Sequence, residues 1–312
     1  MTVAVLNADA RPWLEGKLPA GLEPLWFADQ QDLMRIAPRA DIAWLDMIGA
    51  ANAREAVSAM PNLAWYCAMS SGVDSLPLDL FRARGVTLTN GSGIHAQSVA
   101  EFAVMGMLTM AKGWRTVVRA QDRYEWLSQP PGTRELLGAQ VLVIGAGEIG
   151  SRIAELLRVF GAVVTLARKH SQPGELGQNE WQGALARFDW VILIVPSTPQ
   201  TAGMFGAAQF AAMKRGSVLL NFARGTVIDQ DALLDAIDSG HLGGAFLDVT
   251  TPEPLPPEHP LWSRDNVHIS MHLSGRAQDA LFARGAARFL GNLERFMSGA
   301  PLEHTVDLSA GY

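Results

Sequence analysis

Short apolar segments rich in β-branched residues recur along the chain, separated by segments whose apolar residues repeat at helical spacing. Strands covered by helices on both faces are apolar throughout, so this alternation predicts parallel β-sheets built from βαβ units and favours an α/β fold over a sandwich or a barrel. The predicted strands are Val3–Leu6, Ile42–Leu45, Leu63–Ala68, Val86–Thr89, Val141–Ile144, Val163–Leu166, Val191–Val195, Val218–Leu220, Ala245–Val249 and Val267–Ser270.

Two helical segments indicate how the chain divides. Ser98 and Glu101 have the spacing of a capping box, and the apolar positions that follow predict one long helix to about Gln121. Since this helix lies between two sets of strands, we expect it to connect two domains; a helix within one domain is the alternative. A last helix, expected at 278–297, would pack back on the first domain. We therefore expect a discontinuous substrate domain of residues 1–100 and 276–312 and a dinucleotide-binding domain of residues 101–275.

The composition excludes several classes of protein. A chain of 312 residues is about twice the usual length of one domain, and 48% hydrophobic residues suffice for two cores. The net charge of −6 argues against nucleic acid or an anionic membrane surface as a partner. The longest apolar stretches reach about half of the ~20 residues that span a bilayer, so no membrane segment is expected.

The cysteine content and the first residues bear on the compartment. The only cysteine, Cys67, lies in an apolar strand pattern and is expected to be a buried, inert thiol. The first residues lack the pattern of a signal peptide. Both observations lead us to expect a reducing, cytoplasmic setting.

A glycine-rich turn follows the strand predicted at 141–144. Gly145, Gly147 and Gly150 form G-x-G-x-x-G, with Glu148 and Ile149 between the last two, and a helical run follows. Such glycines allow a tight turn and a close approach of the backbone to a pyrophosphate, which the amino terminus of the helix also attracts. The order of strand, turn and helix predicts that the residues of this turn bind a dinucleotide.

Two basic residues follow the next predicted strand, 18 residues past Gly150. A site that prefers NAD carries an acidic residue here, which binds the ribose 2′-hydroxyl. Arg168 and Lys169 would instead pair with the 2′-phosphate of NADP, and no acidic residue occurs from Gly161 to Gly174 to repel it. The sequence therefore predicts NADPH/NADP in preference to NAD; two solvated surface charges are the alternative.

Further motifs occur in a fixed order along the chain, and together with the glycine-rich turn they resemble those of the D-2-hydroxyacid dehydrogenases, most closely the glyoxylate/hydroxypyruvate reductases. The motifs are Ser71-Gly72-Val73-Asp74, Ser98-Val99-Ala100-Glu101, Val195-Pro196, Asn221-Phe222-Ala223-Arg224-Gly225, Leu247-Asp248-Val249 with Glu253-Pro254, and Asn266-Val267 through His272. The resemblance implies two Rossmann-like domains with doubly wound parallel sheets, a discontinuous substrate domain, a homodimer, and a small-molecule 2-oxo acid as substrate.

The resemblance also implies roles for individual residues. Arg224, Glu253 and His272 would be catalytic: Arg224 binds and polarises the substrate, His272 donates a proton to its carbonyl oxygen, and Glu253 stabilises the charged imidazole. The backbone amides of Ser71, Gly72 and Val73 would bind the substrate carboxylate; an ordinary turn is the alternative. Residues expected to line the cofactor, with core packing as the alternative, are Val195, Pro196, Thr201, Phe222, Ala223 and Asp248.

Two details near His272 refine this picture. The family commonly has Thr-Pro before the catalytic histidine, whereas this chain has Ser270-Met271, which frees a backbone torsion and puts the substrate preference in question. His268 and His272 lie four residues apart on a predicted strand segment, which separates them by about 13 Å. They are too distant to hold one ion, so no metal site is expected.

The expected function is the NADPH-dependent reduction of a 2-oxo acid of glyoxylate or hydroxypyruvate size to the D-2-hydroxy acid. Two alternatives stay open. One is a dinucleotide-sensing binding protein, as in the C-terminal-binding-protein corepressors, which share the fold; the three catalytic residue types favour the enzyme. The other is an NAD-dependent D-lactate-type dehydrogenase, which Arg168 and Lys169 oppose.

Overall fold

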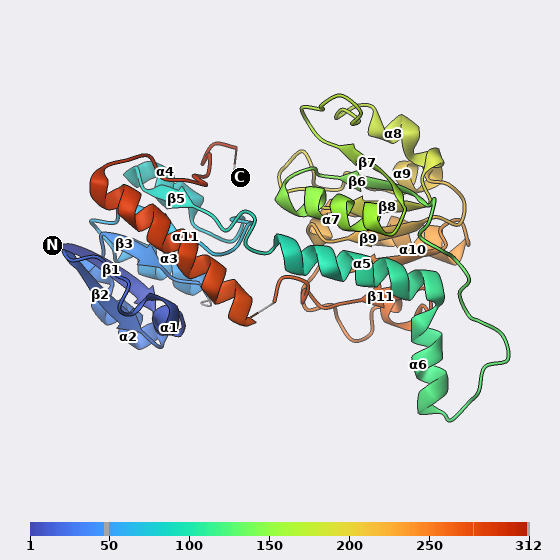
Figure 1. Ribbon diagram of the computed structural model, residues 1–312, viewed down its shortest axis with the longest axis horizontal. Coiled ribbons are helices and arrows are strands. Elements are labelled where there is room, and N and C mark those ends of the chain that lie inside the picture. The colour runs from blue at the N-terminus through green and yellow to red at the C-terminus, as the bar shows by residue number, and fades with distance from the viewer. Residues whose placement is uncertain (47–49, 277, 311–312) are drawn as a thin grey trace. The chain divides into compact units, whose positions relative to one another are not determined.

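The computed structural model describes residues 1–46, 50–276 and 278–310, and the chain folds into two compact units (Figure 1). Unit 1 consists of Met1–His95 and Ala277–Tyr312, and unit 2 of Ala96–Arg276. Each unit contains a parallel β-sheet with helices, so the prediction of two parallel-sheet α/β domains is confirmed. The assignment of the substrate to the domain of residues 1–100 and 276–312 stays a prediction.

The described strands of unit 1 form a parallel sheet in the order β2-β1-β3-β4-β5. Sequence analysis missed β2, because Glu23 and Pro24 interrupt its apolar pattern. Proline is tolerated there since β2 is an edge strand. The strands are β1 (Thr2–Asn7), β2 (Leu22–Phe27), β3 (Ile42–Trp44), β4 (Trp65–Cys67) and β5 (Thr87–Thr89), and the helices are α1 (Arg11–Leu14), α2 (Gln30–Ile36), α3 (Ala50–Ser58), α4 (Leu78–Arg84) and α11 (Gln278–Ser298).

Helices cover both faces of the unit 1 sheet, because successive side chains of a strand point to opposite faces. Tyr66 of β4 packs with residues of α2, α3 and α4 on one face. On the other face, Trp44 and Trp65 pack against Phe289 of α11, with ring centroids 5.3 and 5.2 Å apart. Helix α11, near the C-terminus, thus completes the core of unit 1.

The described strands of unit 2 form a parallel sheet in the order β11-β10-β9-β8-β6-β7. The chain passes from β6 to β7 and then crosses to β8 on the other side of β6, so the winding reverses between β6 and β8. Open α/β sheets bind ligands at the carboxyl ends of the strands beside such a reversal. The strands are β6 (Gln140–Ile144), β7 (Val163–Ala167), β8 (Trp190–Leu193), β9 (Val218–Asn221), β10 (Gly244–Leu247) and β11 (Val267–Ile269), and the helices are α5 (Ala96–Lys112), α6 (Trp114–Asp122), α7 (Glu148–Val159), α8 (Trp181–Ala184), α9 (Ala207–Ala212) and α10 (Gln230–Asp238).

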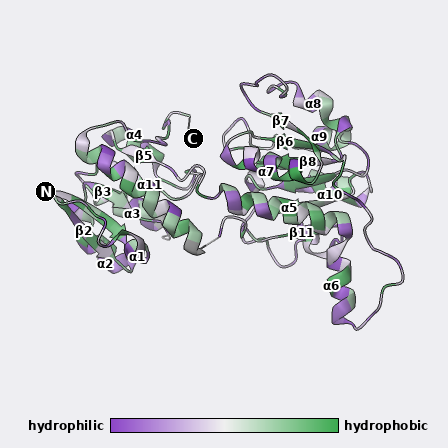
Figure 2. Cartoon of the chain, in the orientation of Figure 1, coloured by the Kyte–Doolittle hydropathy of each residue, from purple (hydrophilic) through white to green (hydrophobic). Residues whose placement is uncertain are grey.

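The strands of unit 2 are apolar throughout because both faces of the sheet are buried. Val141 and Val143 of β6 pack on the side of α5 and α7, whereas Leu142 and Ile144 pack on the opposite side with Phe205. Figure 2 shows the hydrophobic residues on the strands of the sheet and the hydrophilic ones on the outer sides of the helices. This arrangement explains the continuous apolar runs from which the strands were predicted.

The long helix predicted from the capping box onward is two helices. α5 begins at Ala96, so Ser98 lies in its first turn, where its Oγ donates to the backbone oxygen of Ser274. At Gly113 the backbone takes a left-handed φ of 59°, and a Cβ there would lie 2.8 Å from the carbonyl carbon of Pro131. The predictions of a capping box and of a single helix are therefore wrong, because tertiary contacts decide the start and the break.

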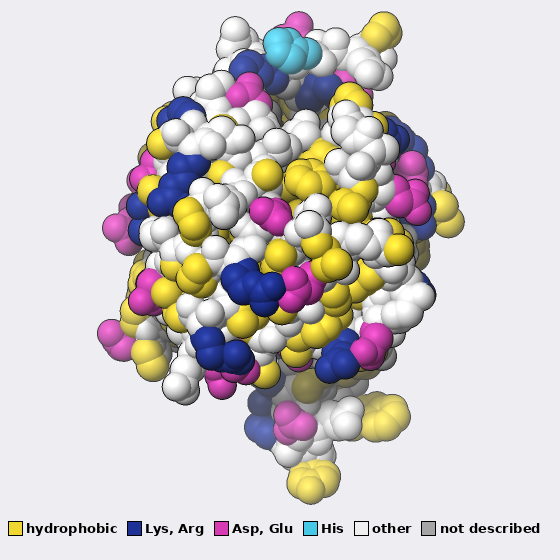
Figure 3. Space-filling view, turned by 90° about the vertical axis from the view of Figure 1, so that its left-hand side faces the viewer, with side chains coloured by type: hydrophobic (Ala, Val, Ile, Leu, Met, Phe, Trp, Pro, Cys, Tyr) yellow, Lys and Arg dark blue, Asp and Glu magenta, His cyan; other side chains and the backbone are white. Residues whose placement is uncertain are grey.

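Charged side chains of both signs are interspersed with apolar ones on the face seen in Figure 3. This mixture agrees with the small net charge of the chain. Among the described residues, no helix has the length and apolar character that a bilayer crossing requires.

Candidate active site

The glycine-rich turn joins β6 to α7 at the carboxyl end of the unit 2 sheet. Gly145 has a φ of 110°, and Gly147 caps α7. A Cβ on Gly145 would lie 2.3 Å from the oxygen of Ile194, and one on Gly150 would lie 1.8 Å from the oxygen of Gly145. A Cβ on Gly147 would meet no heavy atom of the described chain within 4 Å. Gly145 and Gly150 therefore serve close packing, whereas Gly147 leaves open space.

That open space fits the pyrophosphate of a dinucleotide. The first amides of α7 have no partner within the helix and carry the positive end of its dipole, which attracts an anion. Glu148 is exposed in the first turn, and Ile149 packs partly against the apolar core. The turn thus has the room and the donors that a dinucleotide phosphate requires, and the binding of a dinucleotide by its residues stays a prediction.

Arg168, at the end of β7, is paired within the protein. Its Nη2 donates to Oε1 of Glu175 at 2.7 Å, and the two side chains are 29% and 11% exposed. Lys169 is exposed. The interpretation that no carboxylate lies near these cations is wrong. Residues Gly161 to Gly174 contain no acidic side chain, but the next residue, Glu175, folds back onto Arg168.

The segment after β9 is buried, whereas the segment after β8 is partly exposed and is held by hydrogen bonds within its loop. Val195 and Pro196 lie beyond β8, which ends at Leu193 rather than at Val195 as predicted. Thr201 donates from Oγ1 to the oxygen of Pro196 at 2.7 Å, which fixes this loop. Phe222 and Ala223 are 6% and 3% exposed and belong to the core clusters on opposite faces of the sheet. Contact of these residues with a cofactor stays a prediction.

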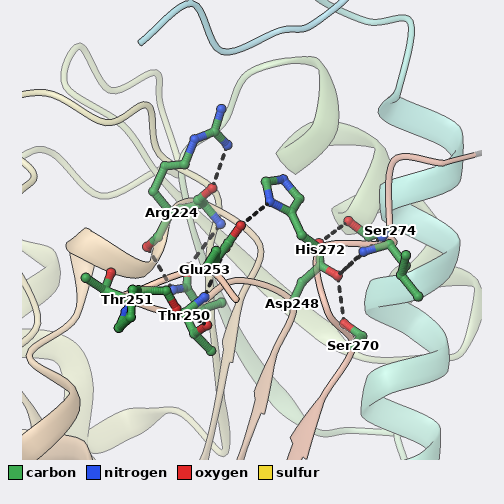
Figure 4. Close-up of polar contacts among 12 residues, drawn as sticks. Arg224, Asp248, Thr250, Thr251, Glu253, Ser270, His272 and Ser274 are labelled. Carbon is green, nitrogen blue, oxygen red and sulfur yellow. Dashed lines mark hydrogen bonds and ion pairs between the residues drawn. The ribbon is translucent and has the colours of Figure 1, made fainter. Parts of the chain in front are cut away.

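Arg224 is placed by the turn between β9 and a short 3-10 helix, Gly225–Val227. Its Nη1 donates to the oxygen of Ala223 at 2.9 Å, and Asn221 donates from Nδ2 to the oxygen of Arg224 at 3.0 Å. A Cβ on Gly225 would lie 2.0 Å from the oxygen of Thr250, so the turn requires glycine there. The partly exposed side chain of Arg224 projects beyond the strand ends (Figure 4).

Glu253 and His272 form a hydrogen-bonded pair beyond β10 and β11. Nδ1 of His272 lies 2.8 Å from Oε2 of Glu253, and the side chains are 45% and 38% exposed. The other oxygen of Glu253 accepts from the amide of Thr250 at 3.1 Å. With Nδ1 engaged, Nε2 is the ring nitrogen that His272 can offer to a substrate. In Figure 4 the imidazole and the guanidinium of Arg224 project to the same side. The structure thus brings together the three residues predicted to be catalytic.

Asp248 holds the turn that carries His272. Its side chain is 2% exposed, and its Oδ1 accepts from the hydroxyl of Ser270 at 2.7 Å and from the amides of Leu273 and Ser274 at 3.1 and 3.3 Å. The hydroxyl of Ser274 donates to Oδ2, and the amide of His272 donates to the backbone oxygen of Asp248 at 2.6 Å. Asp248 therefore organises the turn that carries His272, and its predicted contact with a cofactor stays a prediction.

The backbone of this turn is unusual at two positions. Met271 and His272 have φ values of 54° and 55°, in the left-handed region that non-glycine residues rarely adopt. Proline fixes φ near −65°, so the proline that the family commonly has before the histidine could not take this conformation. The freed backbone torsion expected at Ser270-Met271 agrees with the φ of Met271, and the effect on substrate preference stays a prediction. Met271 is 62% exposed.

The predicted substrate loop lies in unit 1, after β4. Ser71 donates from Oγ to the oxygen of Gly91 at 3.1 Å, and Val73 is 2% exposed in the core. Ahead of them, the amide of Met69 donates to Oδ2 of Asp46 at 2.8 Å. Burial raises the pKa of Asp46 to about 6, against the hydrogen bond from Met69. Ser71, Gly72 and Val73 are thus set on a fixed loop, and their role toward a substrate stays a prediction.

The remaining predicted groups lie outside this constellation. Cys67 is buried, and burial raises the pKa of its thiol to about 12, as expected of an inert cysteine. Burial and the nearby Arg115 and Arg119 lower the pKa of His268 to about 4, so it is neutral at physiological pH. Within the described ranges, no group of three or more His, Cys, Asp or Glu side chains is arranged to hold a metal ion.

Sequence analysis missed the residues that support the predicted ones. Ser270 and Ser274 flank His272 by two residues on either side, and Thr250 lies three residues before Glu253. The symmetric spacing of the two serines was a signal, but hydroxyl residues are common after strands, and the pattern does not show that both serines donate to Asp248.

The comparison with protein families gives a match for residues 104–274, to the NAD-binding domain of D-isomer specific 2-hydroxyacid dehydrogenases. Among curated relatives, the glyoxylate reductase/hydroxypyruvate reductase of Mus musculus is 32% identical over 251 residues, which cover 77% of this chain and 73% of that protein. The D-3-phosphoglycerate dehydrogenase of Mycobacterium tuberculosis is 30% identical over 257 residues, 81% of this chain. The chain spans only 48% of the length of that dehydrogenase.

Solved structures match over nearly the whole chain. A D-isomer specific 2-hydroxyacid dehydrogenase family protein from Aeromonas salmonicida superposes with a TM-score of 0.87 at 29% identity, covering 98% of this chain and 99% of that one. An NADPH-dependent glyoxylate/hydroxypyruvate reductase from Sinorhizobium meliloti, solved with NADP and sulfate, gives a TM-score of 0.86 at 27% identity and 100% coverage of both chains. With more than half of its length matching the family, this chain belongs to the D-isomer specific 2-hydroxyacid dehydrogenases and is an oxidoreductase with an NAD-binding domain.

Proposed function

We propose that the protein reduces small 2-oxo acids, of glyoxylate or hydroxypyruvate size, with NADPH and forms the D-2-hydroxy acid (achiral glycolate from glyoxylate). The observation that carries the proposal is the 2.8 Å contact between Nδ1 of His272 and Oε2 of Glu253, in a chain of this family. The names of the similar proteins from Mus musculus and Sinorhizobium meliloti support this substrate size.

His272 is the proton donor in this proposal. Its Nε2 transfers a proton to the carbonyl oxygen of the substrate, a contribution that is typically about 10²–10⁴-fold in rate. Glu253 fixes the orientation of the ring through Nδ1 and balances the positive charge of the imidazolium. The amide of Thr250 holds the carboxylate of Glu253 in turn, so the donor is positioned by the backbone of the loop after β10.

Arg224 binds the 2-oxo acid. Its planar guanidinium can donate to a carboxylate oxygen and to the carbonyl oxygen at once, which a lysine cannot do with the same geometry. This contact orients the substrate and polarises its carbonyl group. The backbone amides of Ser71, Gly72 and Val73 are proposed as further donors to the substrate carboxylate.

The cofactor is assigned to the glycine-rich turn and the end of β7. The amides at the start of α7 would hold the pyrophosphate over Gly147, where the structure leaves room. Arg168 and Lys169 would bind the 2′-phosphate of NADPH. When bound, the reduced nicotinamide supplies the hydride that adds to C2 of the oxo acid. Val195, Pro196, Thr201 and Asp248 are proposed to lie on its nicotinamide side.

We further propose that the protein acts as a homodimer. α6 exposes Trp114 and Val118 by 52% and 40%, and the loop after it exposes Tyr124 and Trp126 by 98% and 97%. Large apolar side chains this exposed are typical of surfaces that another chain covers. Trp114→Glu combined with Val118→Glu should shift the mass in sedimentation equilibrium from dimer to monomer, and a wild-type protein that sediments as a monomer would refute the proposal.

The test of the function is an assay of purified protein with NADPH and NADH against glyoxylate, hydroxypyruvate, pyruvate and phenylpyruvate. We expect the highest kcat/KM with NADPH and either glyoxylate or hydroxypyruvate. His272→Ala should lower kcat by about 10²-fold or more, with His268→Gln as the matched control. Arg168→Asp should weaken the binding of NADPH far more than the binding of NADH, and Arg215→Asp serves as the control.

Several outcomes would overturn the proposal. Wild-type turnover in His272→Ala would remove the assigned proton donor. If Arg168→Asp weakened the binding of NADPH and NADH equally, Arg168 would have no role in binding the 2′-phosphate. Absence of turnover on every acid, together with oligomerisation that depends on the cofactor, would favour a dinucleotide-sensing binding protein.

A further inference from the structure

The segment after β7 loops out and then runs parallel to the end of that strand, which brings a carboxylate beside Arg168. Leu176 pairs with Ala167 in an isolated parallel bridge: its amide donates to the oxygen of Leu166 at 2.9 Å, and the amide of Arg168 donates to the oxygen of Leu176 at 3.0 Å. Glu175, one residue earlier, thereby lies against Arg168 and accepts from its Nη2 at 2.7 Å. Backbone pairing therefore brings the two side chains together.

Glu175 is the more shielded member of this pair, with 11% of its side chain exposed against 29% for Arg168. Its second oxygen accepts from the amide of Gln172 at 2.9 Å, and its own amide donates to the oxygen of Gln172 at 3.0 Å. Because a shielded carboxylate is costly unless it is paired, these contacts hold Arg168 toward Glu175.

The pairing leaves donors of Arg168 available to an anion. A guanidinium has five N–H groups, and the bond to Glu175 uses one of them. Nε of Arg168 is buried and has no partner within the described part of the chain, so an outside anion must be bound through the Nη groups. Their direction is set by the bond that Nη2 makes to Glu175.

We infer that Glu175 is a positioning residue for the 2′-phosphate of NADPH, acting through Arg168 without contact to the phosphate. This inference rests on the proposed preference for NADPH. Two effects of Glu175 oppose each other: its negative charge repels a phosphate, whereas its bonds immobilise a long side chain and close the turn from Gln172. Since both oxygens of Glu175 are engaged and Arg168 balances its charge, we expect the immobilising effect to outweigh the repulsion.

The test measures binding by calorimetry for Glu175→Gln, Glu175→Asp and wild type, with NADPH, NADH, adenosine 2′,5′-bisphosphate and 5′-AMP. Both variants should bind NADPH and the bisphosphate about 10-fold more weakly, while binding of NADH and 5′-AMP changes less than about 2-fold. Glu180→Gln, which alters a carboxylate that accepts from the amide of Gly177 in the same loop, is the matched control. Combining Glu175→Gln with Arg168→Gln should add nothing to the loss caused by Arg168→Gln alone.

Each other outcome is decisive. Tighter NADPH binding in Glu175→Gln would show that repulsion prevails and overturn the inference. If Glu175→Gln weakened the binding of NADPH and NADH equally, or if the losses of NADPH affinity were additive in the double variant, Glu175 would have only a structural role. If wild type binds NADH as tightly as NADPH, and Arg168→Gln leaves that ratio unchanged, the proposed NADPH preference itself fails. Glu175→Asp keeps the charge and shortens the side chain, so it still decides the matter if Glu175→Gln does not fold.

Discussion

The imidazole of His272 and the carboxylate of Glu253 meet through Nδ1 and Oε2 at 2.8 Å, although 18 residues separate them in the chain. Glu253→Gln keeps the shape of the side chain but removes the charge that balances an imidazolium. We therefore expect kcat for a 2-oxo acid to fall by about 10²-fold while KM changes far less, since the loss concerns proton transfer. Steady-state kinetics at neutral pH measure this effect, and the exposed Glu258→Gln serves as the control.

The buried carboxylate of Asp248 is expected to contribute to both stability and activity. Asp248→Asn should lower the free energy of unfolding by roughly 2 kcal/mol, because a charged acceptor of several hydrogen bonds becomes a neutral amide. Since the turn carries His272, kcat should fall as well. Ser270→Ala removes a single donor and should cost about 1 kcal/mol. Urea unfolding and kinetics measure these changes, and an Asp248→Asn variant as stable as wild type would contradict the role given to this carboxylate.

The left-handed backbone at Met271 predicts that the family's common residue does not fit here. Met271→Pro should disturb the turn and lower kcat at least 10-fold, because the proline ring cannot reach a φ of 54°. Met271→Gly, which adopts this φ freely, should keep kcat within about 3-fold of wild type. An active Met271→Pro enzyme with unchanged kinetics would show that the turn has another conformation in solution.

Two glycines of the same motif should respond differently to alanine. At Gly150 the added methyl group would lie 1.8 Å from the oxygen of Gly145, so Gly150→Ala should lower the free energy of unfolding by about 1–3 kcal/mol or more. At Gly147 it meets open space among the described residues, so stability should stay within about 1 kcal/mol of wild type. Gly147→Ala should nevertheless weaken dinucleotide binding at least 10-fold. Thermal unfolding measures the change in stability, and calorimetric titration measures dinucleotide binding. Equal losses of stability in Gly150→Ala and Gly147→Ala would contradict the different roles given to the two glycines.

Asp46 should make the stability of unit 1 depend on pH. Its pKa of about 6 in the folded protein lies above the ordinary value of 3.8, so the folded state binds this proton more tightly than the unfolded state. The stability that it contributes is fully present below about pH 4 and is lost as the pH rises through 6. Asp46→Asn does not titrate, so its free energy of unfolding relative to wild type should rise by about 2–3 kcal/mol from pH 4 to pH 7. A difference that is constant or falls with pH would contradict the assignment.

The strands and the glycine-rich turn were predictable because their signals are local. A strand buried on both faces must be apolar at every position, and the turn needs glycine wherever a Cβ would strike the backbone. β2 was not predicted because an edge strand buries less apolar surface and tolerates a proline such as Pro24. The predicted capping box was wrong because the hydroxyl of Ser98 donates to the backbone oxygen of Ser274, which is distant in the sequence.

By itself the sequence determined the fold class, the position of the glycine-rich turn and the identity of the residues that carry the resemblance to the family. Only the tertiary structure decided which groups meet: Glu253 with His272, Asp248 with the serines beside that histidine, and Glu175 with Arg168. The physical reason is that apolar periodicity records the burial of each residue separately. A hydrogen bond or ion pair between distant residues depends on how the strand ends and loops are brought together, which no local pattern encodes.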